Sequence, residues 1–138
     1  MVQALIVAHG DLARALLETV ESLTGPQPGV RALSNRDCNL PDLVERIREA
    51  AGAMGPGPLF IFADLLGGSC SQAARMVVEG RPEWRLVTGV SVPMLVNFFQ
   101  NRDTAEPARI LELLVDRARA GVRVFPEGGD AVDPRPAG

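Results

Sequence analysis

Two side chains with a capacity for acid–base or nucleophilic chemistry follow two apolar runs of this sequence. His9, the single histidine of the chain, comes directly after QALIVA at 3–8, and Asp64 comes directly after LFIFA at 59–63. A carboxylate that accepts the Nδ1 proton of an imidazole fixes its tautomer and leaves the Nε2 lone pair free. Such a pair suits a general base or a nucleophile if the fold brings the two residues together.

A short glycine-rich segment after Asp64 could bind an anion beside that imidazole. Gly67 and Gly68 let backbone amides approach a ligand closely, and Ser69 is expected to cap the following helix. The first amides of a helix lack intrahelical acceptors and lie at the positive end of its dipole. Each signal is weak alone, but together they predict a site where a phosphoryl group on His9 meets fixed donors.

Apolar periodicity predicts the elements that position these residues. The expected strands are 3–8, 30–34, 59–63 and 84–89; the expected helices are 11–24, one capped by Asn39, roughly 69–79, a short one near Pro93, and 105–120. Alternating strands and helices indicate an α/β fold with an open parallel sheet and helices on both faces. We expect the flavodoxin-like strand order 2-1-3-4, which makes the first and third strands neighbours and brings His9 beside Asp64. VRVF at 122–125 is a possible fifth, C-terminal edge strand.

Length and composition favour one cytoplasmic domain. The 138 residues fit a folded unit at 1–125, and the proline- and glycine-rich tail at 126–138 is expected to be disordered. No apolar run reaches the roughly 18–20 residues that span a bilayer, so no direct membrane insertion is expected. No signal peptide is recognisable at the N-terminus.

Charge and residue types exclude several function classes. The net charge is −3 and no basic patch is present, which argues against nucleic-acid binding. All 14 basic residues are arginine, which excludes a P-loop lysine and a Schiff base. Cys38 and Cys70 with one histidine fall short of the usual zinc ligand set, so free thiols, no metal and no cofactor are expected.

Three separated blocks of the sequence carry a resemblance to a known family. They are IVAHGDLARALLETVESLTG, FIFADLLGGSCSQAARMVVEG and VTGVSVPMLVNFFQNRD, and together they cover about residues 4–120. In this order they resemble the mannose-family IIA components of the bacterial phosphoenolpyruvate-dependent sugar phosphotransferase system. The resemblance implies a phosphotransferase that works through a phosphohistidine.

The resemblance also implies roles for single residues. His9 would accept a phosphoryl group from phosphohistidine on the carrier HPr and pass it to a IIB component, which phosphorylates sugar during uptake. Asp64 would orient His9, and Gly67, Gly68 and Ser69 would line the phosphoryl site. No cofactor is implied.

Other implied features concern the rim of the cleft and the assembly. Leu65, Leu66 and Pro93 would border the cleft, and residues 122–125 would pair with the sheet of a second copy in a homodimer. Leu65 and Leu66 depart from the threonine and aromatic that family members often carry, and Cys70 stands where proline is frequent. The segment VRALSNRDCNLPD also matches poorly, so the identity of the partner is less well predicted than the acceptor histidine.

Three other functions remain open at this point. The chain could be a stand-alone regulator whose phosphorylation on His9 controls another protein. It could be the phosphoryl-donor subunit of a dihydroxyacetone kinase, which shares this fold. It could also be a non-catalytic ligand-binding module, in which case replacing His9 would leave function intact. Neighbouring genes for membrane components or for regulators would separate the first alternative from a role in transport.

Overall fold

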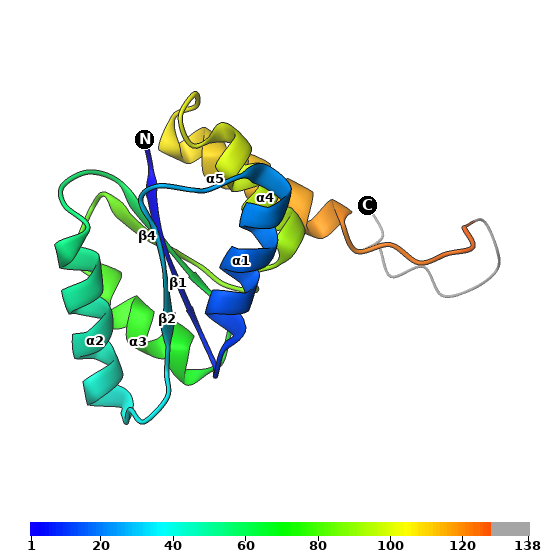
Figure 1. Ribbon diagram of the computed structural model, residues 1–138. Helices are drawn as coiled ribbons and strands as arrows, with labels where there is room; N and C mark the ends of the chain where they lie inside the picture. Colours follow the sequence, from blue (N-terminus) through cyan, green and yellow to red (C-terminus); the bar gives the residue numbers. More distant parts are fainter. Residues whose placement is uncertain (128–138) are drawn as a thin grey trace.

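A parallel sheet between two helical layers forms the framework of the computed structural model, which describes residues 1–127 (Figure 1). The elements are β1 (Gln3–Ala8), α1 (Leu12–Thr24), β2 (Val30–Ser34), α2 (Leu40–Ala53), β3 (Leu59–Ala63), α3 (Ser69–Val78), β4 (Trp84–Val87), α4 (Val92–Asn101) and α5 (Pro107–Ala120). Within the described residues the strand order is β2-β1-β3-β4, and every pairing is parallel. The predicted α/β fold class and strand order are confirmed.

Alternating side chains of the two central strands enter two separate cores. Ile6 and Phe62 belong to the core under α1, α4 and α5, whereas Leu5 and Ile61 belong to the core under α2 and α3 (Figure 1). Burial on both faces explains why β1 and β3 read as continuous apolar runs. The rings of Phe62 and Phe98 pack edge to face, with their centroids 5.1 Å apart, and this contact holds α4 against the sheet.

Helix boundaries follow the predicted caps in two places. The side chain of Asn39 accepts a hydrogen bond from the amide of Asp42 at 2.9 Å and so caps α2 as expected. The short helix expected near Pro93 is a ten-residue helix, because Ser91 caps it and apolar residues continue its buried face. No helix in the part of the chain described here is long and apolar enough to cross a membrane.

Residues 122–125 differ from the prediction. They form no strand in this single chain, and the side chains of Val122 and Phe125 are 67% and 73% exposed. A strand requires a pairing neighbour, and this segment leaves the end of α5 away from the sheet (Figure 1). Of the tail expected to be disordered, 126–138, residues 128–138 lie outside the described part of the chain.

Candidate functional site

The ends of β1 and β3 bring His9 and Asp64 into direct contact. The sheet register pairs Val7 with Ala63, so both polar residues emerge at the same edge of the sheet. Nδ1 of His9 lies 2.8 Å from Oδ2 of Asp64. The backbone N–H of His9 donates to the same oxygen at 3.0 Å, a contact that sequence reasoning missed. One carboxylate oxygen therefore holds both the backbone and the ring of the histidine.

The ionisation of Asp64 decides the tautomer of the ring. Burial raises the pKa of this carboxyl, but hydrogen bonds from the backbone and ring of His9 and the charge of the imidazole lower it further, to below its usual value. At neutral pH the carboxylate can only accept, so Nδ1 of His9 donates, and in the uncharged form of the ring Nε2 keeps its lone pair. The histidine side chain is 44% exposed, against 12% for Asp64, so the free nitrogen is accessible to a large reactant.

A tight turn presents the histidine between β1 and α1. Gly10 adopts a left-handed backbone conformation, with φ of +60°, which permits this turn without a Cβ penalty. Its N–H donates to the side-chain oxygen of Asn35 at 3.1 Å, and the amide of Leu12 donates to the carbonyl of His9 at 3.3 Å. Asn35 was not predicted as part of the site, although an amide directly after the 30–34 strand is a readable signal.

The start of α3 lies beside the free face of the ring. Ser69 Oγ is 3.5 Å from His9 Nε2, and a Cβ on Gly68 would come within 3.0 Å of His9 Cε1. The prediction that Ser69 caps the helix is wrong, because Gly68 occupies the cap and Ser69 is the first helical residue. The hydroxyl is thereby free to face the ring. A Cβ on Gly67 would meet nothing within 4 Å, so its role stays a prediction.

The residues expected at the rim differ in their placement. Leu65 and Leu66 are 58% and 76% exposed in the loop that leads to α3. The hydroxyl of Ser71 donates to the carbonyl of Leu65 and ties this loop to the helix. Pro93, in contrast, packs against the end of α5, where a Cβ on Gly121 would lie 3.2 Å from its ring. The structure thus places Leu65 against Gly68, beside the ring of His9, and Pro93 against Gly121, so the rim role of Pro93 stays a prediction.

A thiol lies beneath the imidazole. Sγ of Cys70 is 3.9 Å from His9 Nδ1, and the residue is fully buried. Burial, together with the negative charge of Asp64, raises the pKa of Cys70 to about 11, which makes it a poor nucleophile. Cys38 is a second free cysteine. Among residues 1–127, His9, Asp64 and Cys70 form a group whose ligand atoms lie within 4.8 Å of one another, close enough to consider a metal ion.

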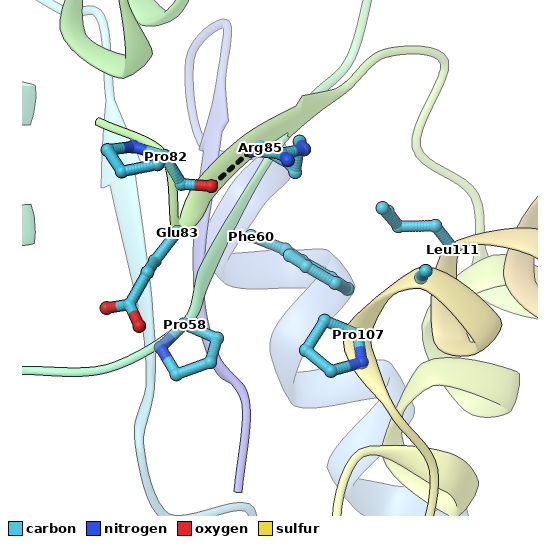
Figure 2. Close-up of a pocket in the computed structure, with 8 residues that line it drawn as sticks. Pro58, Phe60, Pro82, Glu83, Arg85, Pro107 and Leu111 are labelled. Carbon is cyan, nitrogen blue, oxygen red and sulfur yellow. Dashed lines mark hydrogen bonds between the residues drawn. The ribbon is translucent and has the colours of Figure 1, made fainter. Parts of the chain in front are cut away.

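A separate hollow opens at the other end of the sheet. It has a volume of about 250 Å³ and lies beside β4 and the start of α5 (Figure 2). Its lining residues include Pro58, Phe60, Glu83, Arg85 and Leu111. The strand residues come from the amino-terminal parts of β3 and β4, whereas His9 and Asp64 follow carboxyl ends. This hollow is therefore no part of the histidine site.

Comparison with known proteins places these features in a family context. A family model described as "PTS system fructose IIA component" matches residues 3–115. The PTS system mannose-specific EIIAB component of Escherichia coli (strain K12) is 31% identical over 125 residues, which cover 87% of this chain and 38% of that protein. The PTS system sorbose-specific EIIA component of Klebsiella pneumoniae is 28% identical over 104 residues, 75% of this chain and 77% of that protein. The chain thus spans about two fifths of the length of the mannose-specific relative.

Solved structures share the fold. Phosphotransferase system component EIIA from Streptococcus agalactiae superimposes with a TM-score of 0.82 at 19% sequence identity, covering 91% of this chain and 98% of the other. The PTS IIA protein associated with the fucose utilization operon of Streptococcus pneumoniae gives a TM-score of 0.80 at 23% identity, covering 89% and 92%. At these identities the likeness concerns the arrangement of the sheet and helices.

Proposed function

This chain belongs to the mannose-type IIA family of the phosphoenolpyruvate-dependent phosphotransferase system, and on that premise we propose that His9 carries a phosphoryl group between two proteins. The donor is phosphohistidine on HPr, and the acceptor is a IIB component that phosphorylates sugar during uptake. One observation carries the proposal. The imidazole is held at Nδ1 by Asp64, while Nε2 faces Ser69 and the start of α3 on an exposed side.

The proposed step is an in-line displacement at phosphorus. The lone pair of His9 Nε2 forms the new N–P bond while the N–P bond to the donor histidine breaks. The ring becomes positively charged, and the carboxylate of Asp64 stabilises that charge through the proton on Nδ1. Phosphoryl transfer passes through a loose transition state, so the main work of the protein is alignment and charge stabilisation. The step requires no cofactor.

Donors at the start of α3 are placed to hold the phosphoryl oxygens. Amides in the first turn of a helix lack intrahelical acceptors and favour negative charge. The Ser69 hydroxyl, 3.5 Å from Nε2, supplies a further donor beside the new bond. Because Gly68 carries no side chain, the ring and these donors can approach closely, since a Cβ there would lie 3.0 Å from the ring. We assign the phosphoryl-binding role to this segment, with Gly67 as its flexible start.

The surroundings of the site suit protein partners in the cytoplasm, where we place the exchange. Leu65 and Leu66 present two exposed apolar side chains in the loop between Asp64 and α3. Exposed apolar residues grouped beside a reactive group are typical of a docking surface. HPr and the IIB component would cover these leucines in turn, each bringing its own histidine up to Nε2. Pro93 stays a proposed residue of the cleft rim.

We further propose that two copies form a homodimer through their C-terminal segments. Within the described residues β4 is an edge strand, so one side of its backbone is unpaired. Residues 122–125 lack a strand partner in their own chain, and Val122 and Val124 are 67% and 52% exposed. Pairing of residues 122–125 with β4 of a second copy would give the backbone of each a hydrogen-bonding neighbour. The folded unit would then be 1–125, as the sequence predicts.

Reconstitution of the phosphoryl relay tests the proposal. The chain is incubated with phosphoenolpyruvate, enzyme I and HPr, and the modified residue is mapped by mass spectrometry at alkaline pH. We expect one phosphoryl group on His9, stable in base and labile in acid, and none when HPr is omitted. Absence of transfer from a cognate HPr, or phosphate on another residue, would refute the proposed role.

A further inference from the structure

We propose that His9, Asp64 and Cys70 form a binding site for a thiophilic divalent cation of the Zn²⁺ class, which blocks the acceptor histidine when it is occupied. Their ligand atoms lie within 4.8 Å of one another, and Sγ of Cys70 is 3.9 Å from Nδ1 of His9. Imidazole nitrogen, carboxylate oxygen and thiolate sulfur together are a donor set that favours Zn²⁺ over Mg²⁺ or Ca²⁺. A water would complete the tetrahedron.

A second observation on Asp64 supports a cation at this place. Oδ2 already accepts from the backbone and ring of His9, whereas Oδ1 is buried and finds no hydrogen-bond partner among residues 1–127. A buried carboxylate oxygen without a donor is costly, and a cation removes that cost directly. The side chain lies at the exit of β3, so this oxygen is held by the sheet rather than by a mobile loop.

The distances allow coordination after a small movement. At Zn–N of about 2.0 Å and Zn–S of about 2.3 Å, nitrogen and sulfur ligands of tetrahedral zinc lie roughly 3.5 Å apart. The separation of 3.9 Å between His9 Nδ1 and Cys70 Sγ is close to this value. Nδ1 of His9, now 2.8 Å from Asp64 Oδ2, must turn toward the cation, which Asp64 would bind through Oδ1 while Oδ2 keeps the backbone N–H of His9. The histidine side chain is 44% exposed and has room to shift.

Protons balance when the cation binds. The thiol of Cys70 loses its proton to solvent, because a coordinated sulfur is a thiolate. The ring proton of His9 moves from Nδ1 to Nε2, so that the imidazole stays neutral and one proton is released overall. Nε2 then carries a hydrogen and has no lone pair for phosphorus. This consequence rests on the proposed function, whereas the binding site itself does not.

Metal titration of the purified full chain tests the site without any phosphotransfer. Zn²⁺ alone is titrated calorimetrically, and Co²⁺ serves as a spectroscopic probe because thiolate ligation gives a charge-transfer band in the near ultraviolet. We expect one Zn²⁺ per chain and a thiolate band with Co²⁺. Loss of an outer-shell partner already costs about 10–100-fold in metal affinity, so Cys70→Ser should weaken binding by at least roughly 100-fold and abolish the band.

The second cysteine provides a matched control. Cys38→Ser should bind Zn²⁺ as the original chain does, because Cys38 is not in the group formed by His9, Asp64 and Cys70. Circular dichroism checks that both variants are folded, and Cys70→Ala serves as a second variant if the serine is not tolerated. Unchanged affinity in the Cys70 variants, an equal loss in Cys38→Ser, or no thiolate band in the original chain would overturn the site.

A second experiment tests whether bound Zn²⁺ prevents phosphorylation of His9. Phosphorylation of His9 by phospho-HPr is measured with and without Zn²⁺ in the original chain and in Cys70→Ser. We expect Zn²⁺ to slow phosphorylation only in the original chain, which excludes an effect on HPr or enzyme I. Zinc binding without any slowing would overturn the blocking role. Failure of phosphorylation in the absence of metal would instead refute the proposed function and leave the titration result intact.

Discussion

Two nitrogen-bearing side chains at opposite ends of the sheet, His9 and Arg102, have contrasting surroundings. His9 follows the carboxyl end of β1, has a half-exposed ring and uses one nitrogen for Asp64. Arg102 lies near the amino ends of β1 and β2 and is only 3% exposed. Its guanidinium donates to the carbonyls of Val2 and Pro28, at 3.4 and 2.6 Å, and to the side chain of Gln27 at 3.1 Å.

The difference separates the proposed reactive group from a structural one. Burial lowers the pKa of Arg102, although the nearby charge of Asp103 raises it in part, and a guanidinium stays charged throughout the physiological range. Its guanidinium donates to three acceptors on two chain segments, at Val2 and at 27–28, and it also stacks over Phe98 and Phe99 at 5.9 and 5.4 Å. His9 uses Nδ1 for Asp64 and has Nε2 3.5 Å from the Ser69 hydroxyl. Replacing Arg102 should lower the stability of the fold, and replacing His9 should affect phosphoryl transfer.

The largest effect is expected from His9→Gln. Glutamine has no nitrogen lone pair that can accept a phosphoryl group, so incorporation from phospho-HPr should be abolished. Because the histidine side chain is 44% exposed and packs little, the free energy of unfolding should change by less than about 1 kcal/mol. Radiolabel transfer and urea denaturation measure the two quantities. A large loss of stability with residual transfer would reverse the assignment.

The next effect is expected from Asp64→Asn. The amide cannot stabilise the positive ring and can favour the wrong tautomer, so transfer should slow by roughly 10²-fold, within the usual range for acid–base assistance. The protein should still fold, because the substitution is isosteric. Single-turnover transfer from phospho-HPr is the measurement. Transfer at the original rate would show that the contact between Asp64 and His9 is incidental to the chemistry.

Arg102→Met should show the opposite profile. Its loss leaves the carbonyls of Val2 and Pro28 without donors, which should lower the free energy of unfolding by about 1–3 kcal/mol. Transfer per folded molecule should stay unchanged, since the residue lies at the far end of the sheet. Arg109→Met is the matched control, because Arg109 is exposed and should alter stability by less than about 0.5 kcal/mol. Equal effects of the two substitutions would contradict the structural role of Arg102.

The smallest effect is expected at the apolar rim. Leu66 is 76% exposed, so Leu66→Ser should change the free energy of unfolding by less than about 0.5 kcal/mol. If HPr covers this side chain, the apparent affinity for HPr should fall by less than tenfold, which corresponds to less than about 1.4 kcal/mol. Leu23→Ser, on the exposed part of α1 distant from His9, is the control and should leave that affinity unchanged. Identical affinities in both variants would remove Leu66 from the docking surface.

The buried strands and the residues that directly follow them could be predicted from this sequence. The apolar runs of β1 and β3 predict their central position, and that position alone brings His9 to Asp64. Details that depend on side-chain contacts across loops could not be predicted from the sequence. The cap of α3 is Gly68 and not Ser69, at a position where a Cβ would lie 3.0 Å from the imidazole, and the contact of Asn35 with Gly10 depends on a turn with positive φ.

The state of the histidine ring tests the central claim most directly. Because the chain has a single histidine, nitrogen NMR on protein labelled at histidine reports on His9 alone. We predict that the uncharged form of the ring carries its proton on Nδ1 in the original chain, with Nε2 bare, and that this preference is lost in Asp64→Asn. A ring with its proton on Nε2, or the same tautomer mixture in both proteins, would contradict the claim that Asp64 prepares the acceptor nitrogen.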